Sequence, residues 1–298
     1  MLFLRLMRYR IDLAYNGAEF CGWQVQPSGP SVQESLEKAL CTLLRTRVQV
    51  TGAGRTDTGV SASFYVAHFD FNSPVPTHLA SASDFLDCKQ LQFKLNAILP
   101  KSVSIISITP AEAEFHARFD AKKRQYTYFL HRTKDPFCER YSFYYAYPEV
   151  DFAAMNLAAQ TLLGTHDFSC FEKSGGDNKT SVCTIFKAHW EPYTPTIFSG
   201  NPACRGRNSV VIGAEQEPLY WRFTIEADRF LRNMVRAIVG TLLEVGRGRR
   251  TIHDFQALIL PVQERPANQI VDSKGPSRRS EAGESVPGHA LFLSNIQY

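Results

Sequence analysis

Apolar and charged side chains alternate near the start of the chain, and this two-residue period restricts the segment to a half-buried β-strand. The alternation runs through Arg8, Tyr9, Arg10, Ile11, Asp12, Leu13 and Tyr15. Ser31 and Glu34 follow with the spacing of a helix capping box. Apolar residues then recur at helical spacing over 32–44. A strand that leads into an amphipathic helix therefore opens the fold.

The first 108 residues continue this pattern in the order β-α-β-β-α-β, which is typical of the ferredoxin-like fold. Further strands are predicted from Val48 and over 65–71 and 103–108, with a second helix over 84–98. The rest of the chain predicts helices over 152–163 and 229–245, and strands over 125–130, 182–190, 219–226 and 290–297. We therefore expect an α+β protein with two fused halves, 1–131 and 132–298. The stretches 192–218 and 268–287 are expected to be exposed loops.

The composition agrees with two modest cores or one large core, since 44% of the 298 residues are hydrophobic. The net charge of +4 is compatible with a nucleic-acid partner but does not require one. The seven cysteines are scattered and include no Cys-x-x-Cys pair, which argues against a disulfide framework or a zinc site. No apolar run approaches the roughly 20 residues of a membrane helix. We therefore expect a protein of the reducing cytoplasm, with no membrane partner.

Residues 54–60 read Gly-Arg-Thr-Asp-Thr-Gly-Val and form the best candidate for a catalytic centre. Glycines let the backbone take positive φ and approach a ligand closely, so they can present Asp57 at the tip of a turn. A carboxylate held in this way can act as nucleophile or base. Asp and Gly also dominate turns for conformational reasons alone. On this segment alone, a supporting role for Asp57 in a turn is the favoured interpretation.

Three strings precede this segment in a fixed order: Tyr15-Asn16-Gly17, Gly22-Trp23-Gln24 and Ser31-Val32-Gln33-Glu34. With them the chain resembles the bacterial TruA-type tRNA pseudouridine synthases over nearly its whole length. The resemblance implies two ferredoxin-like halves that share a mixed, mainly antiparallel sheet with a central active-site cleft. The chain departs from the family pattern at Asn16, Ser61 and Ala290, where Asp, His and Gly are usual.

The resemblance also implies an activity: isomerisation of uridine to pseudouridine at positions 38, 39 and 40 of the tRNA anticodon stem-loop. Asp57 is then the nucleophile. The family further implies a homodimer, with the tRNA crossing both subunits. Neither a metal ion nor a cofactor is expected, because this redox-neutral isomerisation needs no hydride or phosphate donor.

Two more catalytic residues follow from the resemblance. Arg236 ends the string Phe-Leu-Arg-Asn-Met-Val-Arg over 230–236, in which the family's last arginine pairs with the nucleophilic aspartate. Tyr126 stands at the position of the tyrosine that contacts the target base. The expected substrate-binding residues are Arg55, Phe115, His116, Arg118, Lys179 and Leu291.

These binding candidates suit RNA because cations contact phosphates and aromatic rings stack on bases. Arg229 and Arg232 share a predicted helix edge with Arg236 and are further phosphate candidates, although a plain solvated face is the favoured interpretation for both. His166 is expected to be a structural hydrogen-bonding residue. Leu291 stands where the family has a strand that lines the uracil pocket.

Other functions fit the residues less well. Asp57-Thr58-Gly59 is also the triplet of aspartic proteases, but that chemistry needs two carboxylates that share a proton and the chain has one such triplet. Gly52-x-Gly54 is no dinucleotide fingerprint, because a strand pattern follows it where a helix is required. A non-catalytic RNA-binding protein is the stronger alternative. Such a protein would have no need of Asp57.

Overall fold

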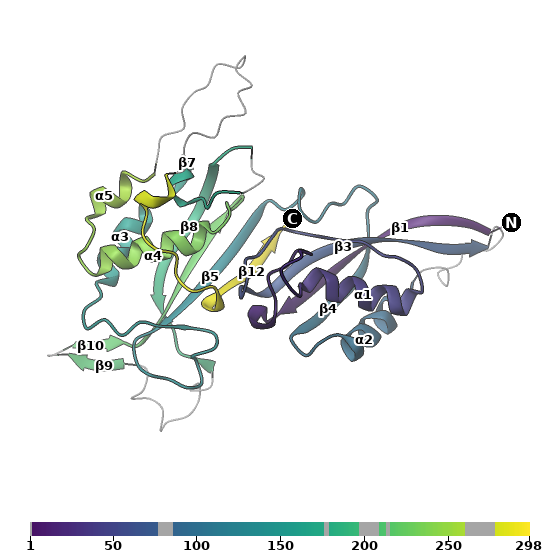
Figure 1. Ribbon diagram of the computed structural model, residues 1–298, viewed down its shortest axis with the longest axis horizontal. Coiled ribbons are helices and arrows are strands. Elements are labelled where there is room, and N and C mark those ends of the chain that lie inside the picture. The colour runs from purple at the N-terminus through teal and green to yellow at the C-terminus, as the bar shows by residue number, and fades with distance from the viewer. Residues whose placement is uncertain (1, 77–85, 176–178, 197–208, 213–214, 260–277) are drawn as a thin grey trace, which may run out of the picture. The chain divides into compact units, whose positions relative to one another are not determined.

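The computed structural model describes residues 2–76, 86–175, 179–196, 209–212, 215–259 and 278–298. The chain forms two compact units (Figure 1): Met1–Lys122 with Leu293–Tyr298, and Lys123–Phe292. Strand β5 (Lys123–His131) therefore belongs to the second unit, whereas the sequence analysis assigned residues 1–131 to the first half. As a functional boundary, the division between residues 131 and 132 stays a prediction.

The first unit is built on four antiparallel strands with two helices packed beside them (Figure 1). The strands are β1 (Leu2–Tyr15), β2 (Val50–Gly52), β3 (Ser61–Pro76) and β4 (Val103–Ala111), and the helices are α1 (Val32–Leu44) and α2 (Cys88–Ile98). The spatial order is β4-β1-β3, with β2 also paired to β3 and β12 (Leu291–Gln297) lying next to β3. The order β4-β1-β3-β2 is that of the expected ferredoxin-like half.

The alternating residues of β1 form the core of the first unit, as their period predicts. Tyr9, Ile11 and Leu13 are fully buried, and Tyr9 pairs in register with Phe69 of β3. On α1 the apolar face is buried, and the Ser31 hydroxyl caps the helix by accepting a hydrogen bond from the Glu34 N–H at 3.2 Å.

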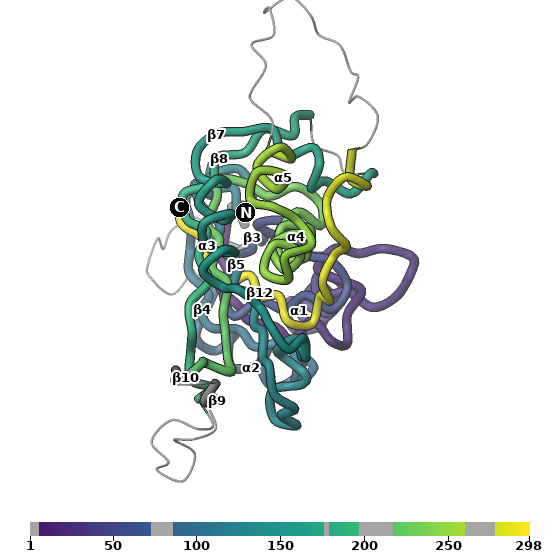
Figure 2. Tube along the Cα trace, turned by 90° about the vertical axis from the view of Figure 1, so that its left-hand side faces the viewer, coloured from purple at the N-terminus to yellow at the C-terminus, as the bar shows by residue number. Residues whose placement is uncertain are grey.

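The second unit repeats this order of elements with β5, α3 (Phe152–Gln160), β8 (Val182–Pro192), β11 (Tyr220–Ala227) and α4 (Met234–Gly246). Its strands are ordered β5-β11-β8-β7, where β7 is Gly164–Asp167, and β6 (Phe143–Tyr144) pairs with β5 in parallel. Helices α3, α4 and α5 (Ile252–Gln256) lie together in both views (Figures 1 and 2). The expected α+β class with mixed, mainly antiparallel pairing is confirmed. The expected cleft stays a prediction.

Three expectations about the second unit need correction. The helix predicted over 229–245 begins at Met234, because Asn233 has a left-handed φ of 64° and residues 229–233 precede the helix. Within 192–218, β9 (Ser209–Ile212) and β10 (Glu215–Pro218) pair antiparallel, so this stretch is not all loop, and residues 197–208 and 213–214 lie outside the described residues. Within 268–287, residues 268–277 lie outside the described residues. Residues 278–287 contain the 3-10 helix η6 (Arg279–Glu281) and bury Ala282 and Val286.

Candidate active site

Asp57 lies in the turn that joins β2 to β3. The Val60 N–H donates to the Asp57 carbonyl oxygen at 3.1 Å and closes the turn. Gly59, the third residue of this turn, has a φ of 77°, a backbone conformation that strongly favours glycine. Asp57 is half-buried and Arg55 is exposed, while Thr56 between them is buried. This loop therefore buries Thr56 and leaves Asp57 partly exposed.

Three aromatic residues, Tyr15, Trp23 and Tyr65, pack together next to this turn and support it. The rings of Trp23 and Tyr65 stack with centroids 4.1 Å apart, and the Tyr65 hydroxyl hydrogen-bonds the Gly54 backbone. The Tyr15 hydroxyl lies 2.9 Å from Thr56 Oγ1. Sequence reasoning placed Tyr15 in the alternating strand and quoted Trp23 only as part of a motif, and it gave neither residue a role at the Asp57 turn. Tyr15 thus contacts the Asp57 loop directly, and Trp23 packs against Tyr65, which contacts it as well.

The backbone at Gly22 also packs closely against the backbone of the Asp57 loop. Gly22 has a φ of 100°, and a Cβ built there would lie 2.2 Å from the Thr56 carbonyl oxygen. Two residues that depart from the family pattern also hold this region. The Asn16 side chain accepts from the Ala18 N–H at 3.0 Å, and Ser61 Oγ accepts from the Gly17 N–H at 3.0 Å. The unusual residues therefore keep hydrogen bonds that hold the neighbouring backbone.

Phe115, His116 and Arg118 follow β4 in the first unit, in a segment pinned to the strands. His116 Nδ1 accepts from the Arg118 and Phe119 N–H groups at 3.2 and 3.3 Å. The ring of Phe115 lies 5.2 Å from that of Tyr298. Arg118 is exposed. The structure therefore gives Phe115 and His116 mainly scaffolding contacts and leaves Arg118 at the surface.

The strand face beneath this segment carries a buried imidazole and an ion pair. His68 Nδ1 accepts from the Ala117 N–H at 3.2 Å, and burial, helped by the positive charge of Arg8, lowers the pKa of His68 to about 4. Arg8 pairs with Asp70 at 2.7 Å, and its hydrogen bonds lower the pKa of that carboxyl. A neutral His68 thus acts as a backbone acceptor at neutral pH.

Tyr126 and Tyr128 lie two residues apart on β5 of the second unit. Tyr126 is partly exposed and meets the ring of Phe230 edge-on at 5.1 Å. Tyr128 is fully buried and donates its hydroxyl to the Pro287 carbonyl at 3.1 Å. Burial raises the pKa of Tyr128 well above its ordinary value, against the opposing charge of Arg236. Of the two tyrosines, Tyr126 is the one that a ligand can reach.

Arg236 and Leu291 belong to the same unit as Tyr126. Arg236 lies on α4, is half-buried, and donates from Nε to the Val286 carbonyl at 2.7 Å. The Val286 N–H donates back to the Arg236 carbonyl at 3.2 Å. Leu291 is 4% exposed at the start of β12, just after the 3-10 helix η7 (Gly288–Ala290). Residues 286–291 therefore run from Arg236 to the first residue of β12.

Lys179 is exposed, near a loop that two arginines hold by its backbone. Arg229 Nη2 donates to the Thr180 carbonyl at 2.9 Å, and Arg232 Nη1 donates to the Ser174 carbonyl at 3.1 Å. Neither arginine lies on α4, so the shared helix edge expected for Arg229, Arg232 and Arg236 is wrong. The structure gives the first two a role in shaping the loop.

The remaining features bear on other classes of site. His166 Nε2 lies 2.9 Å from the Leu163 carbonyl oxygen, which agrees with its expected hydrogen-bonding role. Within the described ranges, no cluster of three or more His, Cys, Asp and Glu side chains is placed to hold a metal ion. None of the described helices combines the length and apolar character of a membrane span.

Comparison with known proteins shows what this arrangement is similar to. A profile described as tRNA pseudouridine synthase matches residues 158–298. A tRNA pseudouridine synthase A from Parabacteroides distasonis is 44% identical over 98% of this chain and 96% of its own length. The Bacteroides fragilis protein of that name is 41% identical over 99% and 98%, and the Latilactobacillus sakei protein is 34% identical over 98% of each chain. With this identity over almost its full length, the chain belongs to the tRNA pseudouridine synthase A family.

Proposed function

We propose that this protein is an isomerase that converts uridine to pseudouridine at positions 38, 39 and 40 of the tRNA anticodon stem-loop. Its full-length similarity to tRNA pseudouridine synthases A carries the proposal. The motif around Asp57 and the geometry of its turn support it. In this reaction the bond between uracil N1 and ribose C1′ breaks, the base turns, and C5 bonds to C1′. The proton leaves C5 and N1 gains one, so no redox partner is needed.

Asp57 is the proposed nucleophile. Its turn is closed by a backbone hydrogen bond and is supported by Tyr15, Trp23 and Tyr65, so little reorganisation is required when substrate arrives. The carboxylate can attack uracil C6, attack C1′, or assist formation of a glycal. The proposal holds for each of these routes, because all need an ionised carboxylate at this place.

Arg236 and Tyr126 complete the proposed catalytic set. Arg236 orients the carboxylate of Asp57 through a charge-assisted hydrogen bond. Its anchoring to the Val286 carbonyl supports this role, since an anchored guanidinium loses less freedom when it pairs. In this proposal Tyr126 stacks on the target base, and its hydroxyl accepts or relays the proton from C5.

The tRNA is bound mainly through its shape and backbone. Arg55, Arg118 and Lys179 are all exposed cations, as phosphate contacts require. Leu291 lines the uracil pocket, while Phe115 and His116 hold the segment that carries Arg118. We place the enzyme in the cytoplasm as a homodimer, with the tRNA crossing both subunits, on the strength of the family resemblance.

A turnover assay tests the function and the nucleophile together. Purified protein without added cofactor is incubated with uridine-labelled tRNA transcript, and pseudouridine is mapped by position. Asp57→Asn and Asp57→Ala should bind tRNA normally and form no product. Asp87→Asn is the matched control, because Asp87 caps α2 and asparagine caps equally well. If the wild-type protein binds tRNA but forms no pseudouridine, the non-catalytic alternative is favoured. If Asp57→Ala forms pseudouridine, Asp57 is not the nucleophile.

A further inference from the structure

Phe119 is 75% exposed, although its turn is held by several hydrogen bonds. Single exposed hydrophobic residues are common and carry no meaning by themselves. Phe119 differs from such residues in its surroundings. Its ring lies 4.3 Å from the ring of His116, and the guanidinium carbon of Arg118 lies 5.9 Å from its centre. An aromatic face, backed by a second ring and flanked by a cation, is thus presented to solvent.

The backbone beneath Phe119 is tied down from both sides. Arg8 donates to the Phe115 carbonyl at 2.9 Å, and the Tyr298 hydroxyl donates to the Ala117 carbonyl at 2.7 Å. Ala117, held also by His68, is fully buried. Within the turn, Asp120 Oδ2 accepts from the His116 N–H at 2.8 Å. These contacts hold the backbone that carries the exposed ring. A ligand that stacks on the ring therefore causes little further loss of the protein's conformational entropy.

His116 helps to hold the Phe119 turn in place. Its Nδ1 accepts the N–H groups of both Arg118 and Phe119, which fixes the imidazole beneath the phenyl ring. The His116 ring lies against Phe119 at an interplanar angle of 33°, and the Phe119 side chain is still 75% exposed. A flat group of similar size can stack on the exposed part of the ring. Nucleobases meet this requirement, and stacking accepts any of the four because each has a π face.

We propose that Phe119, backed by His116 and flanked by Arg118, is a stacking platform for an unpaired base of the tRNA. This assignment rests on the proposed action on tRNA, and it names a contact outside the proposed catalytic set. Arg118 supplies the nearby positive charge for the phosphate of the stacked nucleotide. Phe115 and His116 then act as positioning residues that hold the platform.

The test compares tRNA affinity for Phe119→Ala, Phe119→Trp and Phe119→Leu with the wild-type protein, using an unmodified tRNA transcript. Loss of a base stack weakens binding about 5- to 150-fold, so Phe119→Ala should fall in that range. Phe119→Trp should bind as wild type does. Phe119→Leu, which keeps apolar bulk without a π system, should resemble the alanine variant. Phe93→Ala is the matched control, because Phe93 on α2 is 76% exposed, and it should bind normally.

Two further readouts separate stacking from other roles. Phe119→Ala should leave the slope of affinity against salt unchanged, whereas Arg118→Gln should lower that slope by about one counterion. At saturating tRNA, the single-turnover rate of Phe119→Ala should equal that of the wild type. Wild-type affinity in Phe119→Ala, or equal weakening in the tryptophan and alanine variants, would overturn the platform. Self-association that Phe119→Ala abolishes in the absence of RNA would assign the ring to a protein contact and overturn it as well.

Failure of the proposed function has a different signature. If the wild-type protein forms no pseudouridine and Phe119→Ala weakens tRNA binding, the stacking platform stands and the proposed enzymatic activity is wrong. If the wild-type protein forms pseudouridine and Phe119→Ala binds tRNA with unchanged affinity, the proposed activity stands and the stacking platform is wrong.

Discussion

Gly52 ends β2 and Gly54 follows it in the loop that carries Asp57, yet the surroundings of the two glycines differ. A Cβ at Gly52 would lie 2.3 Å from the Tyr65 hydroxyl oxygen and 2.5 Å from the Trp23 ring. A Cβ at Gly54 would meet nothing within 4 Å, and Gly54 is not among the glycines with positive φ. The first glycine therefore serves packing of the aromatic cluster. The second leaves open space beside the proposed nucleophile.

Alanine substitution should separate these two roles. Gly52→Ala should destabilise the protein by about 1–3 kcal/mol, because the aromatic cluster must shift. Gly54→Ala should change the free energy of unfolding by less than about 0.5 kcal/mol and should still lose turnover, because the added methyl group occupies space that the substrate backbone needs. Chemical denaturation and the pseudouridine assay measure the two effects. A fully active Gly54→Ala would show that substrate does not use this space.

His68 should make the stability of the protein sensitive to mild acid. Its folded pKa of about 4 lies below the ordinary value of 6.5, so the unfolded chain binds a proton that the folded chain does not. The contribution is fully present above pH 6.5 and is lost as pH falls towards 4, by about 3 kcal/mol. His68→Asn keeps an acceptor for the Ala117 N–H and removes the titration. Denaturation at several pH values should show a shallower slope for this variant, and identical slopes would contradict the assignment.

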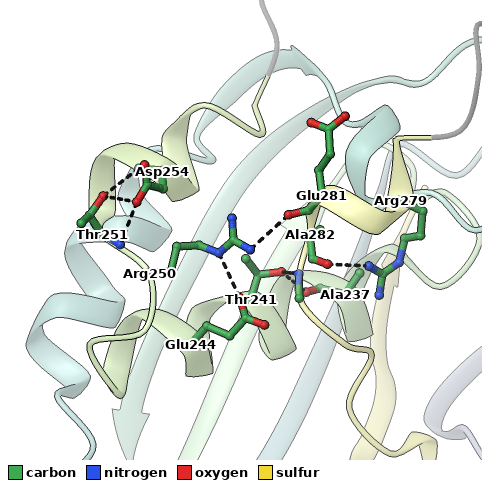
Figure 3. Close-up of polar contacts among 10 residues, drawn as sticks. Ala237, Thr241, Glu244, Arg250, Thr251, Asp254, Arg279, Glu281 and Ala282 are labelled. Atoms are coloured by element: carbon green, nitrogen blue, oxygen red, sulfur yellow. Dashed lines mark hydrogen bonds and ion pairs between the residues drawn. The ribbon is translucent and has the colours of Figure 1, made fainter.

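At the level of elements, packing that is distant in sequence holds residues 279–287 against α4 (Figure 3). Gly283 donates its N–H to Thr241 Oγ1 at 3.0 Å, and that hydroxyl donates to the Ala237 carbonyl at 2.7 Å. Arg250 Nε donates to the Glu244 carboxylate at 2.9 Å, and Arg250 Nη2 donates to the Glu281 carbonyl at 3.1 Å. These contacts fix the segment that leads to Val286, the anchor of Arg236.

Thr241→Val tests this link. Thr241 is fully buried, so valine would leave the Gly283 N–H without its acceptor and should cost about 1–3 kcal/mol. Thr241→Ser keeps the hydroxyl and loses only a methyl group. Hydrogen exchange should show lost protection at the Gly283 amide in the valine variant and retained protection in the serine variant. Equal protection in both would mean that another group satisfies this amide.

The errors of the sequence analysis follow from this kind of contact. Strand β1 and helix α1 were predictable because each repeats one burial period over many residues. The stretch 278–287 has turn-forming composition, and nothing local reveals that Thr241 and Arg250 hold it. The start of α4 was placed too early because apolar spacing continues through 229–233. Asn233 ends that continuity with a left-handed backbone, which asparagine tolerates better than most residues, but its presence alone does not predict where a helix begins.

The candidate site divides in the same way. The Asp57 turn was predictable, since its glycines and carboxylate are local in sequence. The stacking of Trp23 on Tyr65 was not, because it joins residues that only the fold brings together. Arg229 and Arg232 were candidates for phosphate contacts by residue type. Their hydrogen bonds to the Thr180 and Ser174 carbonyls depend on where the fold places those two residues.

At the scale of the whole molecule, the first unit is discontinuous in sequence. It takes residues 293–298 from the far end of the numbered chain, with Leu293 and Ile296 nearly fully buried. The Lys122 N–H donates to the Gln297 carbonyl at 2.8 Å, and the Arg10 guanidinium lies 4.9 Å from the ring centre of Tyr298. Tyr298 also holds Ala117 beneath the proposed base platform. Stability of the first unit and tRNA binding should therefore both depend on this strand.

Removal of residues 293–298 should destabilise the first unit selectively. Loss of two buried aliphatic side chains costs about 3–6 kcal/mol, and the lost hydrogen bonds add to this. Amides of β1 and β3 should lose protection from hydrogen exchange, while those of β8 and β11 keep most of theirs. Tyr298→Phe is the graded control: it loses only the hydrogen bond to Ala117, so it should cost about 1 kcal/mol and weaken tRNA binding modestly. Equal loss of protection in β8 and β11 would show that the two units unfold together, and the first unit would then have no separate dependence on this strand.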